Sequence, residues 1–154
     1  MIIERYSEQH RWEIEYIIQC FQDESLAEYG IKIDPDVLSK TIADVREYSF
    51  MLMIDDVCVG ILAGKPVMTP CSDQMIWQEL VWFVLEEHRS MGVLFLNEVR
   101  RILKLEGYDA MSMVCMENSK KDKLYKLYER LGFKPMEHQF IGSLDENDYQ
   151  SETE

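Results

Sequence analysis

The stretch from residue 75 to residue 107 constrains the fold most, because its hydrophobic periodicity changes within a few residues. MIWQELVWFVL, residues 75–85, is rich in β-branched and aromatic residues, which is typical of a buried strand. EEHRSMGVL follows with a single glycine, and from Leu94 to Leu105 apolar residues recur at helical spacing until Gly107 ends the helix. A strand that turns directly into a helix predicts a layered α/β fold.

Two helices are expected before this stretch. Ser7 can cap the first, and Asp34 followed by Pro35 can begin the second. The apolar positions expected to face the core are Trp12, Tyr16, Ile17, Cys20 and Phe21 in the first helix, and Val37, Leu38, Ile42 and Val45 in the second.

Further strands and one more helix complete the pattern. SFMLMI and VCVGILAGKPV predict a β-hairpin that turns at Asp55 and Asp56, and DAMSMVCM (109–116) and EHQFIGSL (137–144) each predict a strand. The helix between these last two strands is expected to close at Gly132. Its apolar face consists of Leu124, Leu127, Tyr128 and Leu131. The order of elements predicts a mixed sheet with helices packed on it.

Length and composition limit the class of protein. A chain of 154 residues with 47% hydrophobic content suits one domain. Its apolar runs are far shorter than the roughly 20 residues of a membrane span, and its N-terminus lacks the apolar core of a signal peptide. The cysteines stand too far apart for a zinc or dithiol motif and are expected to be free thiols: Cys20, Cys58, Cys71 and Cys115. We therefore expect a cytoplasmic protein with no membrane and no metal partner.

The net charge of -13 argues against a nucleic-acid partner, because a polyanion would meet a surface of its own sign. Residues 89–134 hold ten Lys and Arg against six Asp and Glu, a net +4, while the rest holds six against twenty-three, a net -17. This distribution suits a small anionic ligand near the glycine turn and a cationic ligand elsewhere. Ordinary solvated helix faces would give the same pattern.

The glycine turn itself indicates a phosphate site. A strand that turns into a helix exposes backbone N–H groups at the positive end of the helix dipole, which favours phosphate. Gly92 would let the backbone approach closely, and Arg89 adds a positive charge.

At these residues the sequence resembles a known family. FVLEEHRSMGVL resembles the acyl-CoA-binding turn of the GNAT N-acetyltransferases, whose signature is Arg or Gln, two residues, Gly, one residue, then Gly or Ala. LYKLYERLGFKPM is similar to the family's second signature, a helix with a Tyr a few residues before Gly-Phe. The two motifs stand in the family's order, and the chain resembles short bacterial and bacteriophage members.

The resemblance implies a fold and a reaction. It implies a single GNAT domain over residues 1–144, with a mixed, mostly antiparallel sheet of six or seven strands flanked by about four helices, and an acidic, mobile tail over 145–154. The reaction would be transfer of acetyl from acetyl-CoA to a primary amine, by direct attack in a ternary complex. No metal would take part, and a homodimer is allowed. The residues expected to bind the cofactor are Phe83, Val84, Leu85, Arg89, Ser90, Met91, Gly92, Val93, Leu94 and Asn118.

Two positions depart from the family's pattern. Leu94 stands where the motif has Gly or Ala, so that its side chain either crowds the pyrophosphate or points into the core. Asn118 stands ten residues before Tyr128 and seven before Tyr125, whereas family members often have this Asn seven residues before the helix Tyr.

Catalysis requires an acid for the departing thiolate and a base for the amine. Tyr128 is the candidate acid, with Tyr125 as the alternative, although Tyr128 also fits the apolar face of its helix. Glu79 is the candidate base. Gln78 stands where several family members have their Glu, a bulge would exchange these two neighbours, and Glu117 acting through a water is a further alternative.

Three functions are compatible with the sequence. The first is an acetyltransferase acting on a protein lysine or N-terminus, since the acidic remainder of the chain favours a cationic acceptor. The second is an acetyltransferase for a small amine such as a polyamine or an aminoglycoside. The third is a non-catalytic acyl-CoA-binding or interaction protein with the same fold.

Overall fold

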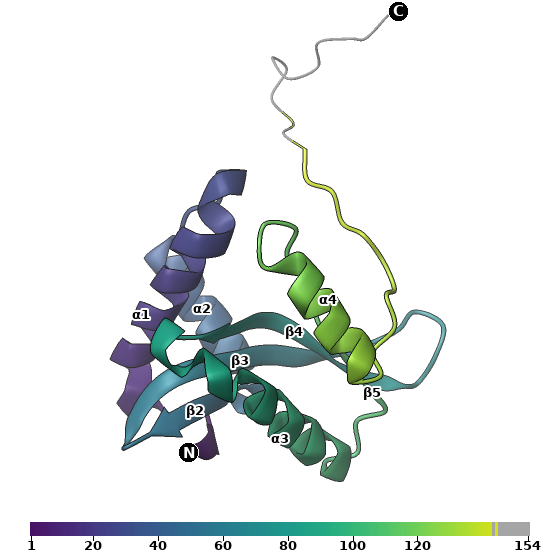
Figure 1. Ribbon diagram of the computed structural model, residues 1–154, viewed down its shortest axis with the longest axis horizontal. Coiled ribbons are helices and arrows are strands. Elements are labelled where there is room, and N and C mark those ends of the chain that lie inside the picture. Colours follow the sequence, from purple (N-terminus) through teal and green to yellow (C-terminus); the bar gives the residue numbers. More distant parts are fainter. Residues whose placement is uncertain (143, 145–154) are drawn as a thin grey trace, which may run out of the picture. The chain divides into compact units, whose positions relative to one another are not determined.

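The computed structural model describes residues 1–142 and 144, and the predicted tail, 145–154, lies outside the described residues. The chain divides into two units, Met1–Ser119 and a second that begins at Lys120. The first unit contains the whole sheet and the helices α1 (Arg11–Phe21), α2 (Pro35–Val45) and α3 (Gly92–Leu105). The second contains α4 (Lys121–Arg130) (Figure 1). The four α-helices of the described residues agree with the prediction.

The sheet has five strands in the order β1-β2-β3-β4-β5. Its members are β1 (Ile2–Arg5), β2 (Phe50–Ile54), β3 (Val57–Met68), β4 (Met75–Val84) and β5 (Ala110–Ser112). The pairs from β1 to β4 are antiparallel, and β4 pairs with β5 in parallel. The predicted α/β class and mixed, mostly antiparallel sheet are therefore confirmed.

The number of strands differs from the predicted six or seven. The edge strand β1 was not predicted, because IIER is too short to show a period. A strand was predicted over 137–144, but residues 137–142 form none, and Phe140 and Ile141 are 94% and 68% exposed. Alternation of apolar and polar residues was therefore not sufficient to place a strand there.

The predicted hairpin between β2 and β3 is confirmed. Asp55 and Asp56 form its two-residue turn with φ of 50° and 61°, both in the left-handed region that a tight hairpin of this kind requires. Aspartate tolerates this conformation better than most side chains, which explains why two acidic residues stand between two apolar strands.

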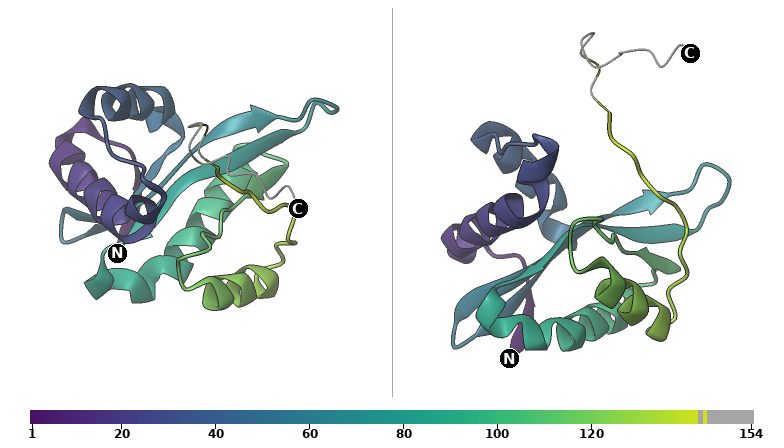
Figure 2. Two further views of the ribbon diagram at one scale, coloured as in Figure 1. Left: turned by 90° about the horizontal axis from the view of Figure 1, so that it is seen from above. Right: turned by 45° about the horizontal axis from the view of Figure 1, so that its top comes forward.

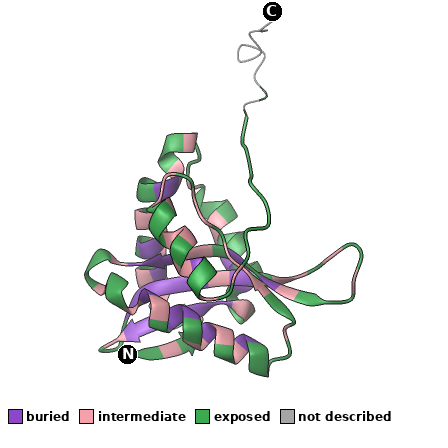
Figure 3. Ribbon diagram, turned by 45° about the vertical axis from the view of Figure 1, so that its right-hand side comes forward, coloured by how far each residue is buried: buried purple, intermediate pink, exposed green. Residues whose placement is uncertain are grey.

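Helices cover both faces of the sheet in the first unit, α1 and α2 on one face and α3 on the other (Figure 2). The buried residues are concentrated on the strands between these layers (Figure 3). Helix α1 buries Ile14 and Ile17 against a cluster that includes Met51, Ile61 and Phe83. Its predicted inward face was partly wrong, since Trp12 and Tyr16 are 83% and 61% exposed.

Helices α2 and α3 follow from their end signals and apolar faces, although Val37, predicted to face inward in α2, is 58% exposed. The Asp34 side chain accepts hydrogen bonds from the backbone N–H groups of Asp36 (2.9 Å) and Val37 (3.1 Å) at the start of α2. Helix α3 buries Phe95, Leu96, Val99 and Leu103, and Gly107, with φ of 89°, follows its end. Among the described residues, no helix is both long and apolar enough to cross a membrane.

In the second unit, α4 ends as predicted at Gly132, whose φ is 87°. The Phe133 N–H donates to the Tyr128 carbonyl oxygen (2.9 Å), and the two aromatic rings lie 5.6 Å apart. This closure and ring contact stabilise the C-terminal end of α4.

Candidate acyl-CoA and amine site

A β-bulge interrupts β4 at Leu80. Ala63 of β3 pairs with Val81 and the next residue, Gly64, pairs with Glu79, so β4 has one more residue than β3 at this point. Gly64 makes the close approach of the strands possible. A Cβ atom at this position would lie 2.4 Å from the Trp77 ring and 2.5 Å from the Gln78 carbonyl oxygen.

Strands β4 and β5 separate just before the bulge. Their pairing consists of Ile76 with Ala110, Trp77 with Met111 and Gln78 with Ser112, and it ends there within the described residues. The Glu79 carboxylate then accepts a hydrogen bond from the backbone N–H of Val114 (2.7 Å), beyond the end of β5. We call this place, where the carboxylate joins the two separating chains, the fork. Within the described residues, β4 therefore runs from Glu79 to Val84 without pairing with β5.

The fork changes the acidity of Glu79. Glu79 is 7% exposed, and burial raises the pKa of its carboxyl to about 7, because the charged form loses hydration. Hydrogen bonds from the backbone N–H groups of Val114 and Trp82 act in the opposite direction. Its neighbour Gln78 is exposed. A carboxyl group with this pKa can exchange a proton near neutral pH.

The end of β4 contributes to the core cluster on which α1 packs. Phe83 is buried and packs edge-on against Phe21 of α1, with ring centroids 6.1 Å apart. The Val84 side chain is buried as well, and the Leu85 N–H donates to the Val59 carbonyl oxygen (2.9 Å). These contacts fix the direction in which the chain enters the glycine turn.

The turn is wound as the 3₁₀ segment η5 (Glu86–Met91), which continues directly into α3. The Gly92 N–H donates to the Arg89 carbonyl oxygen, and Met91 precedes α3 without a capping side chain among the described residues. A Cβ atom at Gly92 would meet only Trp82, at 3.6 Å. The remaining predicted positions are Ser90, which is exposed, Val93, which is half-buried, and Leu94.

The sequence left two alternatives for the Leu94 side chain, and the one in which it points into the core is wrong. Leu94 is 55% exposed, on the first turn of α3. Its side chain therefore lies on the surface at the start of α3.

Arg89 forms an ion pair that the sequence did not predict. Its Nη2 atom donates to both carboxylate oxygens of Glu24 (2.9 and 2.8 Å), and its Nε atom donates to the Val84 carbonyl oxygen (3.3 Å). The guanidinium also lies over the Phe83 ring, 5.5 Å from its centroid. Glu24 belongs to η2 (Gln22–Leu26), a π-helical segment that continues α1.

Asn118 is tied to the same part of the chain. Its Nδ2 atom donates to the Ser25 carbonyl oxygen (3.1 Å) and to the Glu28 carboxylate (2.7 Å). Two acceptors on one nitrogen fix the orientation of the amide. Sequence analysis missed Glu24, Ser25 and Glu28, although QDESLAE, a run of acids directly after an apolar helix, was a visible signal.

Tyr128 belongs to the second unit, where it is 8% exposed. Tyr125, the alternative acid, is half-buried. The structure thus brings Glu79, the end of β4, the turn and Asn118 together within the first unit, while both tyrosines lie on α4.

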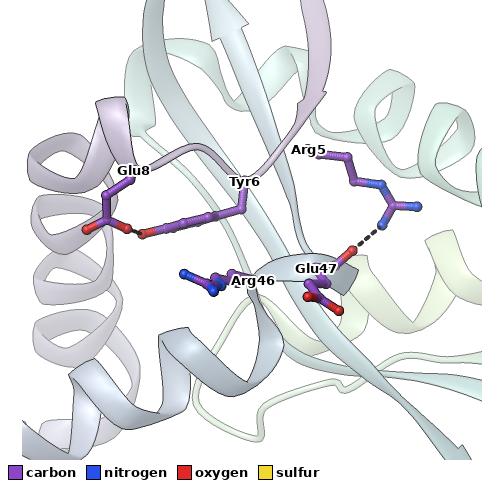
Figure 4. Close-up of a pocket in the computed structure, with 5 residues that line it drawn as sticks. All are labelled: Arg5, Tyr6, Glu8, Arg46 and Glu47. Atoms are coloured by element: carbon purple, nitrogen blue, oxygen red, sulfur yellow. Dashed lines mark hydrogen bonds between the residues drawn. The ribbon is translucent and has the colours of Figure 1, made fainter.

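A cavity of about 300 Å³ lies elsewhere in the first unit and is lined by Arg5, Tyr6, Glu8, Arg46 and Glu47 (Figure 4). None of these residues belongs to β4, η5 or α3. Arg5 donates to the Glu47 carbonyl oxygen (3.1 Å), and the Tyr6 hydroxyl donates to the Glu8 carboxylate. Because several of its polar groups already bind one another, we assign the candidate site to the fork and the turn.

The described residues hold no cluster of three or more His, Cys, Asp or Glu side chains that could bind a metal ion. All four cysteines are free. Burial raises the pKa of the Cys58 thiol to about 12, which makes this cysteine unreactive at neutral pH.

No protein-family model matches the sequence, and no curated protein is significantly similar to it. Solved structures are similar in fold. The BH1408 protein from Bacillus halodurans superposes with a TM-score of 0.72 at 16% identity, covering 94% of this chain and 100% of that one. Aminoglycoside N-acetyltransferase AAC(6')-Iy in complex with CoA superposes with a TM-score of 0.68 at 15% identity, covering 92% of this chain and 93% of that one.

A Trypanosoma brucei acetyltransferase also gives 0.68 at 15% identity, covering 93% of this chain and 99% of that one. Structural similarity at such low sequence identity establishes the fold and not the activity. The chain has the GNAT fold, in which these acetyltransferases are built.

Proposed function

We propose that the protein transfers the acetyl group of acetyl-CoA to a primary amine, with Glu79 as the base. The observation that carries this proposal is the buried Glu79 carboxylate at the fork, on the strand that leads into the glycine turn. A pKa of about 7 suits a group that must take a proton from an amine at neutral pH. The CoA complex of a protein with the same fold supports the choice of cosubstrate.

The proposed reaction is a direct attack. The neutral amine nitrogen forms a bond to the thioester carbon, the carbon–sulfur bond breaks, and the sulfur leaves with the electron pair. Glu79 accepts the proton that the amine loses, and Tyr128 gives a proton to the departing thiolate. The N–H groups of β4 beyond the fork would stabilise the oxyanion that forms on the thioester oxygen.

The cofactor would lie along the first unit from the fork to the turn. The chain at Phe83, Val84 and Leu85, which β5 does not pair with among the described residues, would accept the amide groups of the pantetheine arm. The pyrophosphate would lie against residues 89–94, at the positive end of the α3 dipole. Asn118, held beside η2, would border the other side of the arm.

The acceptor would be cationic. Outside residues 89–134 the chain has a net charge of -17, which attracts an ammonium group and a basic peptide around it. We therefore favour a protein lysine or N-terminus. A small polycationic amine is the second candidate, because several proteins with similar structures are aminoglycoside acetyltransferases.

A panel of acceptors tests the proposal. Purified full-length protein and acetyl-CoA are mixed with a lysine peptide, a peptide with a free N-terminus, a polyamine and an aminoglycoside, and thiol release and product mass are measured. Peptides with both amines blocked are the matched controls. We expect thiol release with at least one free amine and none with the blocked peptides. Tight binding of acetyl-CoA without transfer to any amine would instead indicate a binding protein.

A further inference from the structure

The Nη2 and Nε atoms of the Arg89 guanidinium are engaged within the first unit. The guanidinium donates twice to Glu24 of η2 and once to the Val84 carbonyl oxygen of β4, and it covers the Phe83 ring. Both carboxylate oxygens of Glu24 accept from the one Nη2 atom, a charge-assisted contact that orients the guanidinium. A phosphate that bound Nη2 would first have to displace Glu24.

These contacts form a closed arrangement. Phe21, the last residue of α1, packs on Phe83, and Glu24, three residues later, binds the arginine that covers the same ring. One turn of the chain is therefore attached to the end of β4 by an aromatic contact and by an ion pair. The π-helical winding of η2 places Glu24 directly after the helix that packs on the sheet.

The same segment is attached to the other side of the fork. Asn118, which follows β5, donates to the Ser25 carbonyl oxygen and to Glu28. Residues 22–29 thus connect the chain that leaves β4 with the chain that leaves β5. On the proposed function, an amine would enter the fork between these chains, and we take residues 22–29 as the acceptor side of the fork.

We propose that Arg89 is a positioning residue that fastens residues 22–29 to β4 through Glu24, and not a ligand of the cofactor phosphates. We call the pair Glu24 and Arg89 the clamp. The inference deepens the proposed function, on which it rests for the identity of the amine. The clamp orders the acceptor side of the fork, so its loss weakens the binding of the amine and leaves the affinity for acetyl-CoA nearly unchanged.

Charge exchange separates this role from phosphate binding. The variants are Glu24→Gln, Arg89→Gln and the double exchange Glu24→Arg with Arg89→Glu. Asp44→Asn is the matched control, because Asp44 is an exposed acid of α2, outside the candidate site, that forms no ion pair among the described residues. Three quantities are measured in each full-length variant: hydrogen exchange of peptides covering residues 22–29, acetyl-CoA affinity by calorimetry, and KM for the amine.

The clamp predicts the same result from either single variant. Amide hydrogen exchange over residues 22–29 and KM for the amine rise roughly threefold to tenfold, as expected for one charge-assisted surface pair. The double exchange returns both quantities toward the wild-type values, and Asp44→Asn changes neither. Acetyl-CoA affinity stays within about twofold throughout.

A phosphate-ligand role predicts a different pattern. Arg89→Gln would then lower acetyl-CoA affinity tenfold or more, Glu24→Gln would leave it unchanged or raise it, and the double exchange would restore nothing. That pattern overturns the proposal. Unchanged amide hydrogen exchange over residues 22–29 in both single variants overturns it as well. If the double exchange fails to fold, the two single variants still decide. If no amine is acetylated, hydrogen exchange and calorimetry still test the role of the clamp. Failure of the proposed function can therefore be told apart from failure of this inference.

Discussion

Glu79 is the residue with the most unusual environment in the candidate site. Polar groups that are buried in proteins are usually hydrogen-bonded, and a buried carboxylate carries a desolvation penalty that its partners must offset. Two backbone N–H groups do this only in part, so the pKa of Glu79 stays raised, at about 7. Its chemistry and its contribution to stability are therefore linked.

This linkage predicts how stability depends on pH. The folded state keeps the Glu79 proton up to about pH 7, whereas the unfolded chain releases it near 4.5, so folding loses stability as pH rises between these values. The full loss is on the order of 3 kcal/mol. Glu79→Gln should lack this decline. Urea unfolding of both proteins at pH 5 and pH 8 measures the difference, and parallel behaviour of the two would contradict a raised pKa.

The proposed acid gives a second prediction at the scale of single residues. Tyr128→Phe should lower turnover roughly 10²-fold to 10⁴-fold with acetyl-CoA affinity nearly unchanged, because only proton donation to the thiolate is lost. Tyr125→Phe, on the same helix, is the control and should do little. The reverse ranking would move the acid to Tyr125. No loss from either would mean that the thiolate leaves without a tyrosine proton.

At the scale of elements, the bulge in β4 depends on Gly64. Because a Cβ atom there would overlap the Trp77 ring and the Gln78 backbone, Gly64→Ala should destabilise the protein by about 1–3 kcal/mol in urea unfolding. Gly60→Ala is the comparison, since its Cβ would lie 3.0 Å from a Val84 methyl group, and it should cost less. Equal costs would show that the strands at Gly64 can move apart.

The start of α3 gives a prediction about the cofactor. Gly92→Ala should fold normally, because its Cβ would make one ordinary contact. Acetyl-CoA affinity measured by calorimetry should nevertheless fall from Gly92 through Ala to Val, by roughly tenfold for Val, as side-chain atoms keep phosphate away from the backbone. Unchanged affinity in the Val variant, with an intact circular dichroism spectrum, would remove the turn from the cofactor site.

The elements were largely predictable from the sequence, and the reasons differ between them. The turn at Asp55 and Asp56, the capped start of α2, and the strand, turn and helix around Gly92 each have a local signal. The bulge at Leu80 has none, because it depends on how β3 pairs with β4. The sequence therefore left Gln78 and Glu79 as alternatives, and burial distinguishes them only in the folded chain.

The contacts of η2 were also beyond the reach of the sequence. Glu24 lies 65 positions from Arg89, and Ser25 lies 93 from Asn118, so no periodicity connects them. An arginine in a phosphate-binding motif predicts a phosphate contact, and only tertiary structure could show that its guanidinium is taken by a carboxylate. Local patterns thus predicted the framework, and long-range contacts determined the surroundings of each functional side chain.

At the scale of the whole molecule, charge and fold favour the same ligands. Residues 89–94 lie in the segment of net charge +4, which favours an anionic cofactor, and the remaining -17 favours a cationic amine. Similar structures cover at least 92% of the chain. The central claim is that this fold uses Glu79 to deprotonate an amine.

The pH dependence of kcat/KM tests this claim most directly. Two acceptors are compared, an N-terminal amine with a pKa near 8 and a lysine amine with a pKa near roughly 10.4, so that ionisation of the acceptor can be recognised. We predict an inflection near pH 7 with both acceptors. In Glu79→Gln this inflection should vanish, and the rate at pH 7 should fall roughly 10²-fold to 10⁴-fold. An unchanged profile in the Gln variant, or no transfer by the wild-type protein between pH 6 and 9, would contradict the account.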